Sequence, residues 1–244
     1  MRNLLLTICF DGSAYHGWQV QENAVTVQQT LQDALEQIIH KRDNITGCSR
    51  TDSGVHANMY CCNIRTQSGI ECSKLVSALN AVLPDDIAVR NCIEASPDFH
   101  ARYNCKSKEY IYRIWNSKCR NPFEYKHTFQ YKYPLDEVFL DSQAKDFTGK
   151  HDFSAFCAAG SSVEDTVRTV TCAQVSRDGD LVTFRVCADG FLYNMVRIMV
   201  GTLIEISEGK IAPGTIPEII KSGDRSNSGF TARPEGLFLN RVEY

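Results

Sequence analysis

Paired cysteine motifs are absent from this chain, although eleven of its 244 residues are cysteine. No Cys-x-x-Cys occurs, the cysteines are scattered, and an odd number of them cannot all form disulfides. The neighbours Cys61 and Cys62 would point to opposite faces of a strand. This pattern indicates reduced thiols that serve as small apolar side chains, and it favours neither a metal site nor a disulfide framework.

Long apolar runs are also missing. The longest one extends from Phe191 to Ile206 and contains Arg197, whereas a membrane-spanning helix needs about 20 apolar residues. Residues 1–12 hold one Arg and a short apolar run, without the longer run and small-residue cleavage site of a signal peptide, so they predict a first strand. We therefore expect a cytoplasmic protein with no membrane segment.

The net charge is small, at −3, and gives the chain no overall attraction to nucleic acid. Residues 100–133 are a local exception, because they hold eight Lys or Arg and six Tyr against two Glu. Cations that neutralise phosphates and rings that stack on bases are what an RNA path needs. A solvated strand and loop with aromatic residues in the core explains the same composition.

Hydrophobic periodicity predicts a β-α-β-β-α-β order in the first half, the split βαβ or ferredoxin-like unit. Thr26 and Gln29 form a capping box at the start of its first helix. The predicted strands are residues 3–10, 44–49, 58–65 and 87–93, and the predicted helices are 27–40 and 72–83.

The second half repeats this order less cleanly, with a hairpin turn predicted at residues 177–180. We expect an α+β protein of two ferredoxin-like (βαββαβ) units, residues 1–103 and 104–244, with their sheets joined and a cleft between them. One α+β domain with a single sheet is the alternative. The predicted strands are residues 109–115, 167–175, 181–186 and 237–244, and the predicted helices are 135–147, 191–207 and 216–221.

The stretch Gly47–Ala57, GCSRTDSGVHA, concentrates polar function around one carboxylate, that of Asp52. Asp-Ser-Gly is also the triplet of aspartic proteases, but that chemistry needs two carboxylates that share a proton. No second Asp-Ser-Gly or Asp-Thr-Gly exists in the chain. A plain hairpin turn would explain the triplet, yet it would not require Arg50 and His56 beside it.

Arg197 lies in FLYNMVRIMVGTL, a predicted helix that is otherwise apolar almost all round. Such a helix is buried, and a buried Arg needs a carboxylate partner. We therefore expect Arg197 to pair with Asp52, which would hold that carboxylate ionised and oriented. The alternatives are that Arg197 extends its stem to solvent or has a purely structural partner.

Arg50–Ala57, RTDSGVHA, resembles the signature of the TruA family of tRNA pseudouridine synthases, which usually reads RTDAGVHA. The resemblance covers nearly the whole chain. The other segments that match motifs of this family, in the same order, are Phe10–Gln21, Leu83–Val89, Phe99–Tyr103, Gly149–Phe156, Phe191–Arg197 and Glu235–Leu239.

The resemblance implies isomerisation of uridine to pseudouridine at tRNA positions 38, 39 and/or 40, in the anticodon stem-loop. Asp52 would be the catalytic nucleophile or base, and Arg197 its partner. Arg50 would enter the space that the flipped base leaves, and Leu237 would line the uracil pocket. Tyr110 would be a further catalytic residue that packs on the uracil and helps to move a proton. The family also implies no cofactor, no metal, and a homodimer in which one tRNA contacts both subunits.

The departures from the family pattern are few. Ser53 stands where Ala is usual, residues 231–234 match loosely, and the negative net charge suggests more local tRNA contacts. The other function considered is an RNA-binding module of ferredoxin-like fold without catalysis. The strand Met59–Arg65 lacks the glycine and aromatic pattern of an RNA-recognition motif, which argues against it.

Overall fold

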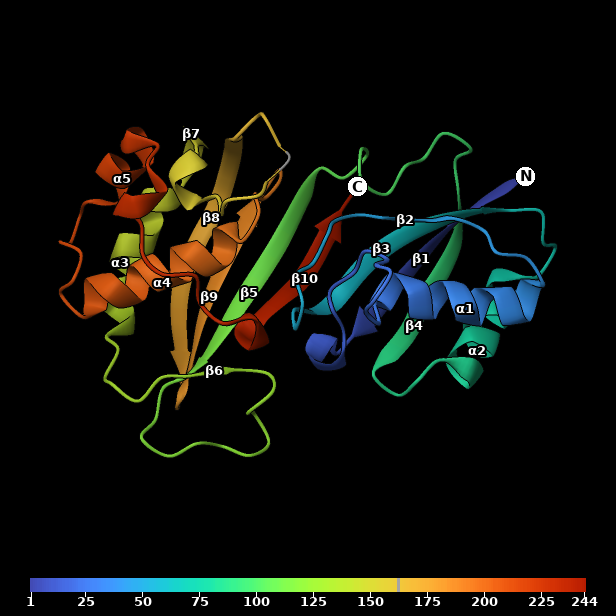
Figure 1. The fold of residues 1–244 in the computed structure, drawn as a ribbon, viewed down its shortest axis with the longest axis horizontal. Helices are drawn as coiled ribbons and strands as arrows, with labels where there is room; N and C mark the ends of the chain where they lie inside the picture. The colour runs from blue at the N-terminus through green and yellow to red at the C-terminus, as the bar shows by residue number, and fades with distance from the viewer. Residues whose placement is uncertain (162) are drawn as a thin grey trace. The chain divides into compact units, whose positions relative to one another are not determined.

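The computed structural model of the protein describes residues 1–161 and 163–244, and Figure 1 shows its helices and strands. The chain forms two compact units, Met1–Lys106 with Phe238–Tyr244, and Ser107–Leu237. This division differs from the predicted one at 103/104 mainly because the C-terminal segment returns to the first unit. In the part of the chain that is described, no helix is both long and apolar enough to cross a membrane.

The first unit has the predicted element order, and every predicted helix and strand in it is confirmed. Its sheet runs β4-β1-β3-β2, and each neighbouring pair is antiparallel. The elements are β1 (Arg2–Phe10), α1 (Val27–Ile39), β2 (Ile45–Gly47), β3 (His56–Thr66), α2 (Cys72–Val82) and β4 (Ile87–Ala95), and a short 3-10 helix, η1, covers Gly12–Ala14.

The last strand, β10 (Leu237–Glu243), runs parallel to the start of β3, with Phe238 opposite His56. The Lys106 N–H donates to the carbonyl of Glu243 at 2.8 Å. This bond joins the two segments of the first unit, Met1–Lys106 and Phe238–Tyr244. The sequence pattern correctly predicts this strand, but its partner strand lies far away in the sequence.

The two helices of the first unit contact each other, as Figure 1 shows. Thr26 caps α1 through its Oγ1, which accepts from the backbone N–H of Gln29 at 3.4 Å, as the predicted capping box requires. Leu31 and Leu35 on one face of α1 are buried. The helix α2 ends just before Pro84, since a residue that precedes proline disfavours the helical conformation.

The second unit has a sheet of order β5-β9-β8-β7, with β6 parallel to β5. The predicted hairpin is confirmed, because Asp178 pairs with Leu181 and leaves a two-residue loop. The elements are β5 (Ser107–Trp115), β6 (Phe129–Gln130), α3 (Glu137–Ala144), β7 (Gly149–Asp152), β8 (Val167–Asp178), β9 (Leu181–Ala188), α4 (Met195–Ser207) and α5 (Ile216–Ser222).

The helix α4 begins at Met195 rather than at the predicted residue 191. Asn194 has φ = 60°, a left-handed conformation that cannot continue a helix toward the N-terminus. The strands β6 and β7 were not predicted from the sequence, because two to four residues carry too little periodicity. The α+β class is confirmed, while the two ferredoxin-like units, their joined sheets and the cleft stay predictions.

Aromatic rings fill the core of the second unit. Phe147 and Phe156 meet edge to face at 5.2 Å, and Phe153 and Phe184 pack around them. All four side chains are buried. Such rings contribute large buried apolar areas and prefer tilted contacts.

We expect Phe156→Ala to lower the free energy of unfolding by about 3–5 kcal/mol, because it removes a ring and leaves a cavity. The midpoint of thermal unfolding, followed by circular dichroism, should fall clearly. Val138→Ala is the control, since Val138 is exposed on α3 and should change the free energy of unfolding by less than about 0.5 kcal/mol. Equal midpoints for the two variants would contradict the buried aromatic core.

Candidate active site

The stretch that the sequence singles out forms the connection from β2 to β3, and we call residues 48–55 the Asp52 loop. It turns at Asp52, whose carbonyl accepts from the Val55 N–H at 3.2 Å. Gly54, at the third position of this turn, has φ = 76°, which favours glycine. The Asp52 side chain is half-buried and the Arg50 side chain is exposed. The hairpin-turn interpretation is therefore right about the backbone, and it leaves the function of the side chains open.

Residues 11–18, which we call the brace, lie against the Asp52 loop. The carbonyl of Tyr15 accepts from the Gly54 N–H at 3.2 Å and from the Ser53 hydroxyl at 3.3 Å. The Trp18 N–H donates to the carbonyl of Thr51 at 3.1 Å. These bonds attach the loop on both sides of Asp52, so the carboxylate projects from a supported turn rather than from a mobile hairpin tip.

Glycine makes this close approach possible. A Cβ on Gly12 would overlap the carbonyl oxygen of Val55, and a Cβ on Gly17 would overlap that of Thr51. Gly17 also has φ = 83°, a conformation that other residues rarely adopt. The glycines of the segment Phe10–Gln21 are thus explained by backbone contact with the Asp52 loop.

The first part of the Asp52 loop rests on two buried aromatic residues. The rings of Trp18 and Tyr60 stack with centroids 4.1 Å apart. The Tyr60 hydroxyl donates to the carbonyl of Ser49, next to Arg50. Because both rings are almost completely buried, this contact fixes where the backbone enters the loop.

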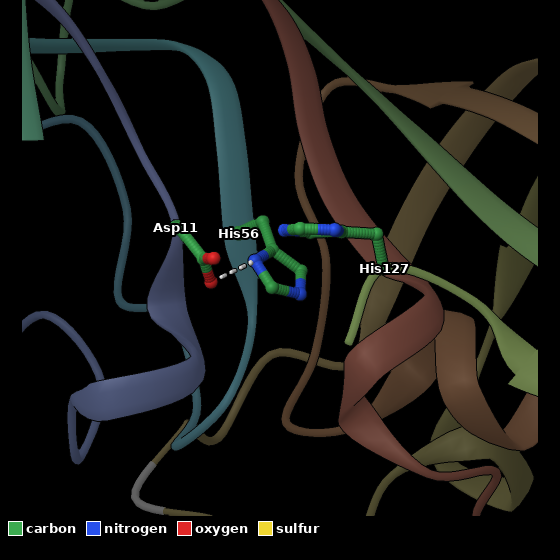
Figure 2. A group of neighbouring side chains, drawn as sticks. All are labelled: Asp11, His56 and His127. Atoms are coloured by element: carbon green, nitrogen blue, oxygen red, sulfur yellow. Dashed lines mark ion pairs between the residues drawn. The ribbon is translucent and has the colours of Figure 1, made fainter. Parts of the chain in front are cut away.

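His56, the last but one residue of the signature, is fully buried at the start of β3. Its Nδ1 lies 3.0 Å from the Gly12 N–H, which donates to it, and 3.1 Å from Oδ1 of Asp11, as Figure 2 shows for the pair. A neutral Nδ1 accepts from Gly12, whereas a protonated one donates to Asp11. The His56 ring also stacks on Phe238 of β10 at 4.5 Å. His56 therefore joins the brace, β3 and the C-terminal strand.

Asp86, in the predicted motif Leu83–Val89, supports the brace from its other side. Its carboxylate accepts from the Tyr15 hydroxyl at 2.6 Å, and its carbonyl accepts from the Asp11 N–H at 2.9 Å. Burial, and then the hydrogen bond to Asp86, raise the pKa of Tyr15 well above its usual value, so this hydroxyl stays protonated and keeps donating. Sequence patterns alone indicate no role for Tyr15, Trp18 or Asp86, although all three lie in the segments Phe10–Gln21 and Leu83–Val89 that match family motifs.

Tyr110, Arg197 and Leu237, the other predicted site residues, belong to the second unit. Tyr110 is buried on β5 and meets Phe191 edge to face at 4.9 Å. Leu237 is buried where β10 begins. Tyr110 shares its face of β5 with the buried Tyr112, as the alternation in the sequence predicts.

Arg197 lies in the first turn of α4 and is half-buried. Its Nε donates to the carbonyl of Ala232 at 2.6 Å, and its Nη1 donates to the side-chain oxygen of Asn194 at 2.7 Å. The Ala232 N–H donates back to the carbonyl of Arg197 at 3.1 Å. The guanidinium is therefore oriented by its own unit. Because Asp52 lies in the first unit, the predicted Asp52–Arg197 pair stays a prediction.

A family model described as tRNA pseudouridine synthase matches residues 7–104 and 143–244 of this chain. The matched residues include Asp52 with its loop and brace, and Arg197 with the helix that carries it. The chain belongs to the tRNA pseudouridine synthase family. It is an enzyme of the isomerase class, and the resemblance stated from the sequence is confirmed.

Curated relatives agree with this assignment. The chain is 46% identical to tRNA pseudouridine synthase A of Acetivibrio thermocellus and 44% identical to the protein of that name from Thermoanaerobacter sp. strain X514. It is 43% identical to tRNA pseudouridine synthase A 2 of Clostridium perfringens. In each case the alignment covers 100% of this chain and 100% of the relative. The aspartic protease and the non-catalytic RNA-binding module are thereby set aside.

We expect Gly17→Ala to lower the rate of pseudouridine formation by about 100-fold, since even a 1 Å displacement of a reacting group can cost that much. The added Cβ must push Thr51, and with it Asp52, away from the brace. The measurement is a time course of isomerisation in an unmodified tRNA transcript.

Two controls separate the possible causes. Gly209 has φ = 71° and nothing within 4 Å of an added Cβ, so Gly209→Ala introduces backbone strain without a clash. An added Cβ on Gly69 also meets nothing within 4 Å, and no unusual φ is involved. Both variants should keep the wild-type rate. A folded Gly17→Ala variant with wild-type activity would show that the brace does not position Asp52.

Proposed function

We propose that this enzyme converts uridine to pseudouridine in the anticodon stem-loop of tRNA, at positions 38, 39 and/or 40, with Asp52 as the nucleophile or base. The observation that carries the proposal is the half-buried carboxylate of Asp52 on a turn that the brace holds through backbone hydrogen bonds. A catalytic group needs this kind of support, because its position must not change as the reaction proceeds.

The reaction requires no cofactor. The bond between C1′ of the ribose and N1 of uracil breaks, the base turns, and C1′ bonds to C5. The hydrogen on C5 leaves as a proton and N1 gains one, so that atoms and electrons balance without an oxidant. One carboxylate is sufficient, whether it attacks the base, attacks the sugar, or abstracts a sugar proton.

The other residues have roles that follow from the resemblance and suit their local surroundings. Arg50 is exposed two residues before Asp52, where a side chain can enter the stack after a base has flipped out. Tyr110 and Leu237 offer a ring and an apolar side chain for the uracil. Arg197, whose guanidinium is oriented by Ala232 and Asn194, would keep Asp52 ionised.

We further propose that the enzyme acts in the cytoplasm as a homodimer in which one tRNA contacts both subunits. The cysteines agree with a reducing compartment, because all eleven are thiols rather than halves of disulfides. The homodimer follows from the resemblance alone.

The test of the proposed function is release of tritium from 5-tritiated uridine in an unmodified tRNA transcript, because bonding at C5 displaces that hydrogen. Wild-type enzyme should release tritium, and Asp52→Asn, which keeps the size of the side chain and removes its charge, should be slower by at least about 1,000-fold. Mapping of the product should place pseudouridine at positions 38 to 40.

The matched control is Asp178→Asn, the same change at an exposed residue beside the β8–β9 hairpin loop, which should keep wild-type activity. Circular dichroism and tRNA binding must show that both variants are folded. Tritium release that survives Asp52→Asn would remove Asp52 from the mechanism. Absence of release by a folded, tRNA-binding wild type would disprove the proposed substrate.

A further inference from the structure

The connection from β5 to β6, residues 116–128, presents two large aromatic side chains to solvent. Phe123 is 90% exposed and Tyr125 is 64% exposed. Figure 1 shows this 116–128 loop in yellow-green beside β6, where it extends beyond the end of the sheet of its own unit. Water disfavours contact with an apolar ring, so two neighbouring exposed rings at a defined place indicate an interaction surface.

The 116–128 loop is ordered by its own hydrogen bonds. At its base, the Trp115 Nε1–H donates to the carbonyl of Cys119 at 3.0 Å, and the Gln130 amide donates to the carbonyl of Ser117. At its tip, Oδ1 of Asn121 accepts from the Phe123 N–H at 3.0 Å. The exposed rings therefore stand on a shaped backbone, which lowers the entropic cost of binding.

The charges beside these rings are almost all positive. Lys118, Arg120 and Lys126 are exposed, and none of the three has an ion pair among residues 1–161 and 163–244. The one acidic residue of the loop, Glu124, is paired with Arg113 of β5 at 3.0 Å. On a chain with a net charge of −3, this is a local surface for an anion.

The structure thus divides the basic and aromatic segment of residues 100–133 into two parts. Tyr110 and Tyr112 of β5 are buried within their own unit. The rings of Phe123 and Tyr125 are accessible to a partner. The Lys126 ammonium lies 6.0 Å from the centre of the Tyr125 ring, so that cation and ring form one patch.

We propose that the 116–128 loop is an RNA-docking surface, on which Phe123 and Tyr125 stack with unpaired bases while Lys118, Arg120 and Lys126 bind the neighbouring phosphates. Exposed rings interleaved with cations are the chemistry by which proteins hold single-stranded nucleic acid. A second copy of this chain is the less suitable occupant, because a two-fold contact would bring three cations against the same three cations. The inference rests on the proposed function, which supplies the tRNA.

The test measures the affinity of an unmodified tRNA transcript at several salt concentrations. Phe123→Ala with Tyr125→Ala should weaken binding by about 10- to 100-fold and leave the salt dependence unchanged, since stacking involves no counterions. Replacement of Lys118, Arg120 and Lys126 by Gln should weaken binding and reduce the slope of log affinity against log salt by about 2–3.

Val138→Ala is the control, because it truncates an exposed apolar side chain of the same unit outside the 116–128 loop, and its affinity should equal that of wild type. Wild-type affinity in both loop variants would overturn the inference. So would a change of oligomeric state by sedimentation with unchanged tRNA affinity, which would assign the loop to a second copy.

The proposed function and the docking surface fail in different ways. If wild-type enzyme binds tRNA through the loop but releases no tritium, the docking surface stands and the proposed function does not. If wild-type enzyme releases tritium and the loop variants bind tRNA as tightly as it does, the proposed function stands and the docking surface does not.

Discussion

The direct contact between two backbone segments is the constraint on which the site in the first unit depends. The brace and the Asp52 loop meet through main-chain N–H and C=O groups, at Tyr15 with Gly54 and at Trp18 with Thr51. Backbones come this close only where Cβ atoms are absent, as they are at Gly12 and Gly17. The connection between two strands, which in most proteins is mobile, thereby becomes a support for the Asp52 carboxylate.

Several side chains around this backbone contact stabilise it. Asp86 accepts from both the Tyr15 hydroxyl and the Asp11 N–H, while Nδ1 of the buried His56 lies within hydrogen-bond distance of the Gly12 N–H and the Asp11 carboxylate. The Tyr15 hydroxyl and the Asp11 N–H thus have partners, which removes the large cost of burying an unpaired polar group. Asp52 itself stays partly exposed and therefore accessible from solvent.

Aromatic residues of the second unit occur both in buried and in exposed positions. The two tyrosines of β5 are buried, and burial raises the pKa of Tyr112 far above its usual value. Its hydroxyl donates to the carbonyl of Arg233, in the segment that also orients Arg197 through Ala232. A few residues further along the chain, Phe123 stands in solvent. Tyr110 and Tyr112 are buried because side chains alternate between the two faces of a strand. Phe123 is exposed because it lies in the 116–128 loop, outside any strand.

The sequence by itself determined the α+β class, the family, and almost every helix and strand. Periodicity and capping are local signals, and for that reason α1, α2 and the β8–β9 hairpin agree closely with prediction. It also singled out Asp52, because Arg50, His56 and the glycine lie within a few residues of it. Only the tertiary structure decided that β10 joins the first unit, that Tyr15, Trp18 and Asp86 support the Asp52 loop, and which aromatic residues are exposed. These features depend on contacts between residues distant in the chain, and no periodicity within a single segment encodes them.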